Sequence, residues 1–98
     1  MNGRNVFFLS ELEDIIRQRL NDRPESSYTA RIAAEGDKRV AQKVGEEAVE
    51  LALASVGGTR KEQIDEAADL LFHVLVLLNC KGISLSDVVD ALKERHDG

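Results

Sequence analysis

The stretch GEEAVELALASVGGTRKEQIDEAADLLFHVLVLL, residues 45–78, decides the fold of this chain. Apolar residues recur at helical intervals on both sides of Gly57-Gly58, a pair that breaks a helix. Thr59 opens a T-x-x-E capping-box pattern, which predicts that a second helix begins directly after the break. We therefore expect a helical hairpin, in which one helix covers residues 38–56 and the other extends to near Lys81.

The sequence on either side predicts shorter helices around this hairpin. They are a first helix opened by Ser10 with Glu13 and ended by Arg23-Pro24, a short helix over residues 28–34, and a last helix opened by Ser84 with Asp87 and ended near His96. No stretch alternates with a period of two, and the predicted connections are short. The predicted fold class is therefore all-α, an antiparallel helical bundle of four to five helices that forms a single domain over residues 1–98.

Composition and charge limit the classes of function. An apolar fraction of 43% beside 32% charged residues is typical of a folded helical protein rather than a disordered one. The formal net charge of -5 argues against a nucleic-acid partner. The single cysteine, Cys80, gives no intramolecular disulfide and no zinc-ligand spacing, which fits a reducing cytoplasm. The N-terminal apolar run is too short for a signal peptide, and His73 interrupts the longest apolar run, so we expect no membrane span.

The second helix of the hairpin is apolar on nearly every side. Between residues 70 and 78 only His73 is polar. A helix of this kind is buried all round, and a chain of this size buries a limited share of its surface. We therefore expect a second copy of the chain to complete the bundle in a homodimer.

Two pairs of carboxylates lie on the two helices of the hairpin. Glu47 and Glu50 are three residues apart, as are Glu66 and Asp69, so each pair shares one helix face. Glu50 precedes the glycine turn by about as many residues as Glu66 follows it, which places the pairs at similar height. Glu46 flanks the first pair.

Oxygen ligands without thiols or convergent histidines suit a hard cation, Mg²⁺ or Mn²⁺, which can in turn hold the phosphates of a polyphosphate. Basic side chains for phosphate contact precede the carboxylates: Arg31, Lys38 and Lys43. His73 could orient a carboxylate of the site or be a hydrogen-bonded core residue. A solvated acidic helix face is the simpler alternative for the carboxylates.

Three segments resemble the phosphoribosyl-ATP pyrophosphohydrolase family of histidine biosynthesis. They are SYTARIAAEGDKRVAQKVGEEAVELALA (27–54), EAADLLFHVLVLL (66–78) and GISLSDVVDALKERH (82–96). The family belongs to the MazG-like, all-α nucleotide pyrophosphohydrolases, whose signature E-x-x-E followed by E-x-x-D matches residues 47–50 and 66–69.

The resemblance implies a reaction: water activated by Mg²⁺ cleaves 1-(5-phosphoribosyl)-ATP to 1-(5-phosphoribosyl)-AMP and pyrophosphate, the second step of histidine biosynthesis. By the motif match, Glu47, Glu50, Glu66 and Asp69 would hold the cation, and Glu46 and Glu47 are the candidate catalytic residues. The resemblance also implies a MazG-like dimer. In some organisms the activity is fused to a cyclohydrolase domain; the length and the absence of its zinc-ligand cysteines predict no fused cyclohydrolase domain here.

Two other functions stay open at this point. One is a MazG-like housecleaning enzyme that hydrolyses non-canonical nucleoside triphosphates. The other is a non-catalytic helical dimerisation module whose acidic residues are merely solvated. Substrate preference separates the first from the family reading, and cation binding separates the second.

Overall fold

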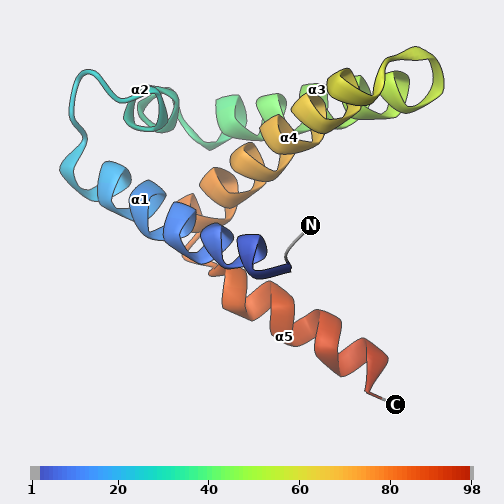
Figure 1. Cartoon of the computed structure of the whole chain (residues 1–98). Coiled ribbons are helices and arrows are strands. Elements are labelled where there is room, and N and C mark those ends of the chain that lie inside the picture. Colours follow the sequence, from blue (N-terminus) through green and yellow to red (C-terminus); the bar gives the residue numbers. More distant parts are fainter. Residues whose placement is uncertain (1–2, 98) are drawn as a thin grey trace.

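The computed structural model describes residues 3–97, which fold into helices joined by short turns (Figure 1). A 3₁₀ helix, η1 (Gly3–Phe7), precedes five α-helices: α1 (Phe8–Asp22), α2 (Tyr28–Ala34), α3 (Asp37–Gly57), α4 (Arg60–Cys80) and α5 (Leu85–His96). No strand occurs within this range. The predicted all-α class is confirmed.

The hairpin of α3 and α4 is the largest unit of the fold, and the two helices run antiparallel beside each other (Figure 1). Thr59 caps α4 through the Glu62 backbone N–H, and the Glu62 side chain returns to the Thr59 N–H, as the capping-box pattern predicts. At Gly58 the backbones are so close that a Cβ atom would lie 2.9 Å from the Ala54 carbonyl oxygen. The turn therefore needs a glycine at this second position.

The core lies where α1 and α2 meet one end of the hairpin. Its buried apolar side chains come from α1, α2, α3 and α4: Ile16, Ile32, Val40, Leu75 and Val76. The other end of the hairpin extends past this core as an arm (Figure 1). In the C-terminal half of the apolar helix α4, His73, Leu75 and Val76 are buried and most other residues are partly buried, while Leu71 is half exposed.

The start of α1 differs from the sequence-based prediction. The helix begins at Phe8, so Ser10 lies inside its first turn and caps nothing. Glu13 is instead a buried residue, and its Oε2 accepts hydrogen bonds from the Leu85 N–H (2.6 Å) and from Asn79 Nδ2 (3.1 Å). The predicted capping box at Ser10 was wrong because the Glu13 carboxylate is taken by a partner far away in the sequence.

Helix α5 leaves the rest of the molecule at the end of α4. Gly82 has a φ of 74°, the left-handed conformation that favours glycine after a helix. Ser84 and Asp87 form the predicted capping box. Helices α4 and α5 meet at 106°. Within residues 3–97 no single helix is long and apolar enough to cross a membrane; α4 and α5 together reach that length and composition only as a bent pair.

Candidate metal centre

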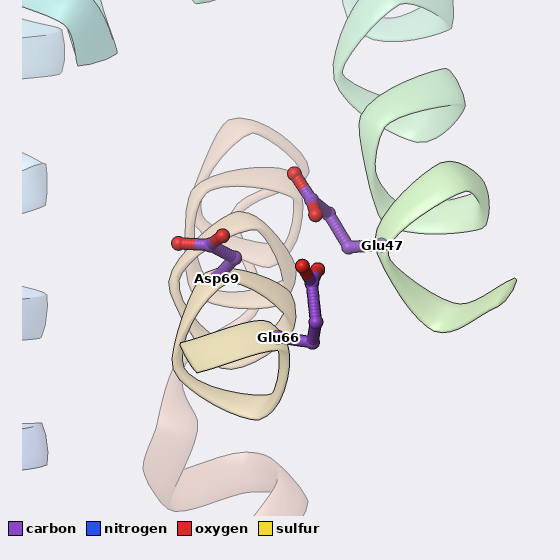
Figure 2. A group of neighbouring side chains, drawn as sticks. All are labelled: Glu47, Glu66 and Asp69. Carbon is purple, nitrogen blue, oxygen red and sulfur yellow. The ribbon is translucent and has the colours of Figure 1, made fainter. Parts of the chain in front are cut away.

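Three of the four predicted ligands converge between the helices of the hairpin. Figure 2 shows Glu66 pointing from α4 toward Glu47 on α3, with Asp69 one turn further along α4. One carboxylate oxygen from each residue lies within 4.8 Å of the others. A single cation could reach all three oxygens after small side-chain rotations, since Mg²⁺–oxygen bonds are about 2.0–2.1 Å long.

Burial falls from one side of this cluster to the other. Glu47 is 6% exposed, Glu66 is half-buried and Asp69 is exposed. The Oε1 atom of Glu47 lies 3.6 Å from Lys43 Nζ and 3.7 Å from His73 Nδ1. The cluster thus has a fixed inner side and an outer side open to a ligand.

The surroundings of Glu66 favour a cation at this cluster. Its Oε2 atom is buried and has no hydrogen-bond partner among the described residues. Hydrogen bonding of the protonated form to the neighbouring Glu50 carboxylate, burial, and repulsion from Glu50, Glu47 and Asp69 raise the pKa of Glu66 from 4.5 to about 7. A buried, unpaired carboxylate oxygen is costly, and a divalent cation would remove that cost. The donor set therefore fits Mg²⁺ or Mn²⁺.

Glu50 stands beside the three-carboxylate cluster rather than in it. It is exposed, and its proximity is the largest cause of the raised pKa of Glu66. Together with Glu62 and Glu66 it lines an open cavity of about 320 Å³ along the hairpin turn. The fourth predicted ligand is therefore next to the site.

Glu46, a predicted catalytic residue, is exposed on α3. Its carboxylate accepts a hydrogen bond from Gln42 Nε2 (3.4 Å) and lies 3.8 Å from Lys43 Nζ. It is outside the group of three oxygens that converge. Its role as a base stays a prediction.

The predicted phosphate-binding residues lie in different places. Lys43 contacts Glu47, as its position four residues earlier indicated. Lys38 is exposed in the first turn of α3. Arg31 donates to the Glu25 carbonyl oxygen (3.3 Å) and lines a separate cavity of about 150 Å³ with Arg23. The structure brings only Lys43 into contact with the cluster.

One functional contact could not be found from the sequence. The Tyr28 hydroxyl on α2 lies 2.8 Å from His73 Nε2 on α4, across 45 residues of chain. His73 itself is buried, and its Nδ1 lies 2.9 Å from the Asp69 carbonyl oxygen. It is therefore both a hydrogen-bonded core residue and a neighbour of the cluster. Tyr28 has no local sequence signal, because α2 contributes it through tertiary packing.

Known proteins similar to this chain match nearly all of its length. The family model described as phosphoribosyl-ATP pyrophosphohydrolase matches residues 9–96. The chain is 53% identical over 91 residues to the histidine biosynthesis bifunctional protein HisIE of Vibrio cholerae, covering 93% of this chain and 43% of that protein. It is 49% identical over 89 residues to HisIE of Escherichia coli, covering 91% of this chain and 44% of that protein.

A relative of similar length is also found. The phosphoribosyl-ATP pyrophosphatase of Sinorhizobium medicae is 48% identical over 89 residues, which cover 91% of this chain and 83% of that protein. The chain thus spans less than half the length of the bifunctional relatives and most of the length of this one.

Proposed function

The chain belongs to the phosphoribosyl-ATP pyrophosphohydrolase family, and from this membership we propose that it hydrolyses 1-(5-phosphoribosyl)-ATP to 1-(5-phosphoribosyl)-AMP and pyrophosphate. The matched segment covers residues 9–96, which supports one domain over residues 1–98. Because the chain spans only part of the bifunctional relatives, the proposal concerns this one activity and its place in histidine biosynthesis. A cytoplasmic location follows from the same pathway.

The observation that carries the proposal is the convergence of Glu47, Glu66 and Asp69, together with the buried Glu66 Oε2 atom, which has no hydrogen-bond partner within residues 3–97. These three residues would hold Mg²⁺, with Mn²⁺ as a substitute. Glu50 would be a fourth carboxylate beside the cation. When bound, the cation supplies charge neutralisation for the polyphosphate and activation of water.

The chain's own residues bind and orient the substrate. Lys43, which lies 3.6 Å from Glu47, is placed to meet a phosphate oxygen at the edge of the cluster. Lys38 stands one to two turns earlier on the same helix, and Arg31 on α2, beside the separate cavity, is the third candidate for a phosphate contact. Glu46 is an exposed carboxylate directly before Glu47, and it is the candidate that could accept a proton from water. Glu47 is the second candidate, although its buried position favours ligation.

We also propose that the enzyme is a homodimer. Val49, Leu53 and Val56 recur at four- and three-residue spacing on α3, so they form one apolar stripe, and Leu53 and Val56 are 68% and 90% exposed. Ile64 and Leu71 expose a matching stripe on α4. A small chain rarely leaves contiguous apolar surface of this kind in water. A second copy of the hairpin would cover it.

Product analysis tests the activity. Phosphoribosyl-ATP is incubated with the protein with and without Mg²⁺ in oxygen-labelled water. We expect phosphoribosyl-AMP and pyrophosphate only with the cation, and the labelled product identifies the phosphorus attacked. A preference for dUTP or dCTP would instead assign a housecleaning enzyme. No binding of Mg²⁺ or Mn²⁺ would leave only a non-catalytic module.

Amide substitutions test the site. Glu47→Gln and Asp69→Asn keep the side-chain size and remove a ligand charge, so turnover should fall by orders of magnitude while far-UV circular dichroism stays helical. Asp65→Asn is the matched control, because Asp65 is exposed and paired with Lys61 at 2.7 Å. Near-normal turnover of both ligand variants would exclude the cluster as the site.

Light scattering after size exclusion tests the dimer. Leu53→Glu places a charge in the apolar stripe and should give a monomer, whereas Ala41→Glu, at an exposed position elsewhere on α3, should leave the dimer intact. A wild-type monomer at all concentrations tested would contradict the assembly.

A further inference from the structure

Hydrogen-bonding groups connect the surface of α2 to the carboxylate cluster. The Tyr28 hydroxyl lies 2.8 Å from His73 Nε2, and His73 Nδ1 lies 2.9 Å from the Asp69 carbonyl oxygen. The same Nδ1 atom is 3.7 Å from Glu47 Oε1, which is a close electrostatic contact but too long for a hydrogen bond. Tyr28 is 42% exposed, so the connection starts at the protein surface and ends at the most buried ligand.

The partners of His73 decide where its proton lies. A backbone carbonyl only accepts, so the Nδ1 atom facing the Asp69 carbonyl oxygen must carry the hydrogen. In the neutral ring the Nε2 atom then has a lone pair, and the Tyr28 hydroxyl must donate to it. The Nδ1–H group consequently presents its positive end to the side on which Glu47 lies.

Packing holds the ring in this orientation. His73 is 5% exposed, and Phe72 and Tyr28 meet it edge to face, with ring centroids 5.1 Å and 5.7 Å away. Rotating the ring by half a turn would break both hydrogen bonds. Glu47 Oε1 also lies 3.6 Å from Lys43 Nζ. His73 and Lys43 together thus direct the Glu47 carboxylate toward Glu66 and Asp69 before any cation binds.

We propose that Tyr28 and His73 are positioning residues of the metal centre: Tyr28 fixes the orientation of His73, and His73 holds Glu47 in its ligating direction. This inference rests on the proposed function, since it takes the carboxylate cluster as the cation site. It extends that function to α2, whose first residue sets the geometry of a ligand on α3. Groups that orient metal ligands change metal affinity by about 10- to 100-fold when they are removed.

Removal of one hydroxyl tests Tyr28. Tyr28→Phe keeps the aromatic packing and deletes only the donor to His73. The dissociation constant of Mn²⁺, measured by calorimetry or by the spin resonance of free Mn²⁺, should rise about tenfold. Thr29→Val is the matched control, because it deletes a hydroxyl from the next residue of α2; its dissociation constant should stay within twofold of wild type. An equal effect of both variants would mean that the hydroxyls act on the packing of α2 in general.

A double-mutant cycle tests whether Tyr28 acts through His73. His73→Asn retains an N–H donor near the Nδ1 position and offers no acceptor to Tyr28. Adding Tyr28→Phe in that background should change the Mn²⁺ dissociation constant less than twofold, because the two residues form one unit. A further tenfold loss would show independent effects and overturn the proposed connection.

The tautomer gives a readout that needs no metal. The chain has two histidines, and His96 on α5 makes a similar Nδ1 contact with the Leu92 carbonyl oxygen (2.8 Å) at the exposed surface. Nitrogen NMR of the metal-free protein should show His73 protonated at Nδ1. Tyr28→Phe should move the His73 signals and leave those of His96 unchanged. An Nε2–H form of His73 would overturn the proposal.

The two hypotheses fail in different ways. Hydrolysis of phosphoribosyl-ATP by a wild-type chain whose Mn²⁺ affinity is insensitive to Tyr28→Phe would refute the positioning role alone. Tight Mn²⁺ binding that depends on Tyr28, without hydrolysis of this substrate, would refute the proposed function and leave the positioning role intact.

Discussion

The raised pKa of Glu66 predicts that cation affinity changes steeply with pH. The pKa is about 7 rather than 4.5, so a proton competes with the cation for this carboxylate throughout the mildly acidic range. Apparent affinity should fall about fivefold from pH 7 to pH 6 and approach a tenfold loss for each further pH unit, which is about 50-fold between pH 7 and pH 5. A carboxylate with an ordinary pKa would show almost none of this change.

The same pKa has a consequence for the metal-free protein. The folded chain binds the Glu66 proton more tightly than the unfolded chain, so this group contributes stability fully below pH 4.5, and that contribution is lost as the pH rises through about 7. The melting temperature without metal should therefore fall across this interval. Added Mg²⁺ should raise it most above pH 7, where the carboxylate is already ionised.

Calorimetric titration with Mn²⁺ from pH 5 to pH 8 is the assay. Buffers with different heats of ionisation count the protons released, and we expect about one at pH 6 for the wild type. Glu66→Gln should bind more weakly at pH 8 but should lose the pH dependence and the proton release. Asp65→Asn makes the same change in net charge at the neighbouring residue and should keep both the pH dependence and the proton release. A flat affinity profile between pH 5 and pH 7 would refute the reasoning.

Three stability predictions follow from other parts of the fold, and urea unfolding measures each. Gly58→Ala should lower the free energy of unfolding by about 1–3 kcal/mol, because its Cβ atom would overlap the α3 backbone. Gly57→Ala has open space around its Cβ atom and should raise the free energy of unfolding by up to about 1 kcal/mol. Equal effects of the two variants would contradict the close approach at Gly58. Glu13→Ala should cost about 1–3 kcal/mol by removing the acceptor of the partly buried Leu85 N–H and one of the two acceptors of Asn79 Nδ2 at the α4–α5 junction. Glu11→Ala, exposed on the same helix, should cost little. Ser84→Ala should cost about 1 kcal/mol through loss of the α5 cap, and no loss would mean that the cap contributes nothing.

The helices could be predicted wherever their signals are local. The glycine pair and the Thr59 capping box define the hairpin within a few residues, and Gly82 with Ser84 defines the start of α5 in the same way. The equal distances of Glu50 and Glu66 from the glycine turn placed the two carboxylate pairs at similar height, because a short turn leaves little freedom in the register of two antiparallel helices. Most of the candidate site follows from these local rules.

Three features of the structure depend on packing between distant parts of the chain and could not be predicted from the sequence. Ser10 and Glu13 have the spacing of a cap, but Glu13 is bonded to the junction of α4 and α5, and the helix starts earlier. Tyr28 meets His73 only because α2 folds back onto α4. Helical spacing also could not distinguish Glu50, which is exposed beside the cluster, from Glu47, which is buried within it. Each of these outcomes depends on a neighbour that is distant in the chain.

The hydrogen bond from the Leu85 N–H to Glu13 fixes the N-terminal end of α5 to α1. Its 12 residues span about 18 Å, and its N-terminal end is held at one carboxylate of α1. A tilt of about 10° at this pivot would displace the far end by about 3 Å. Such a tilt would move the C-terminal surface, far from the hairpin that carries the carboxylates.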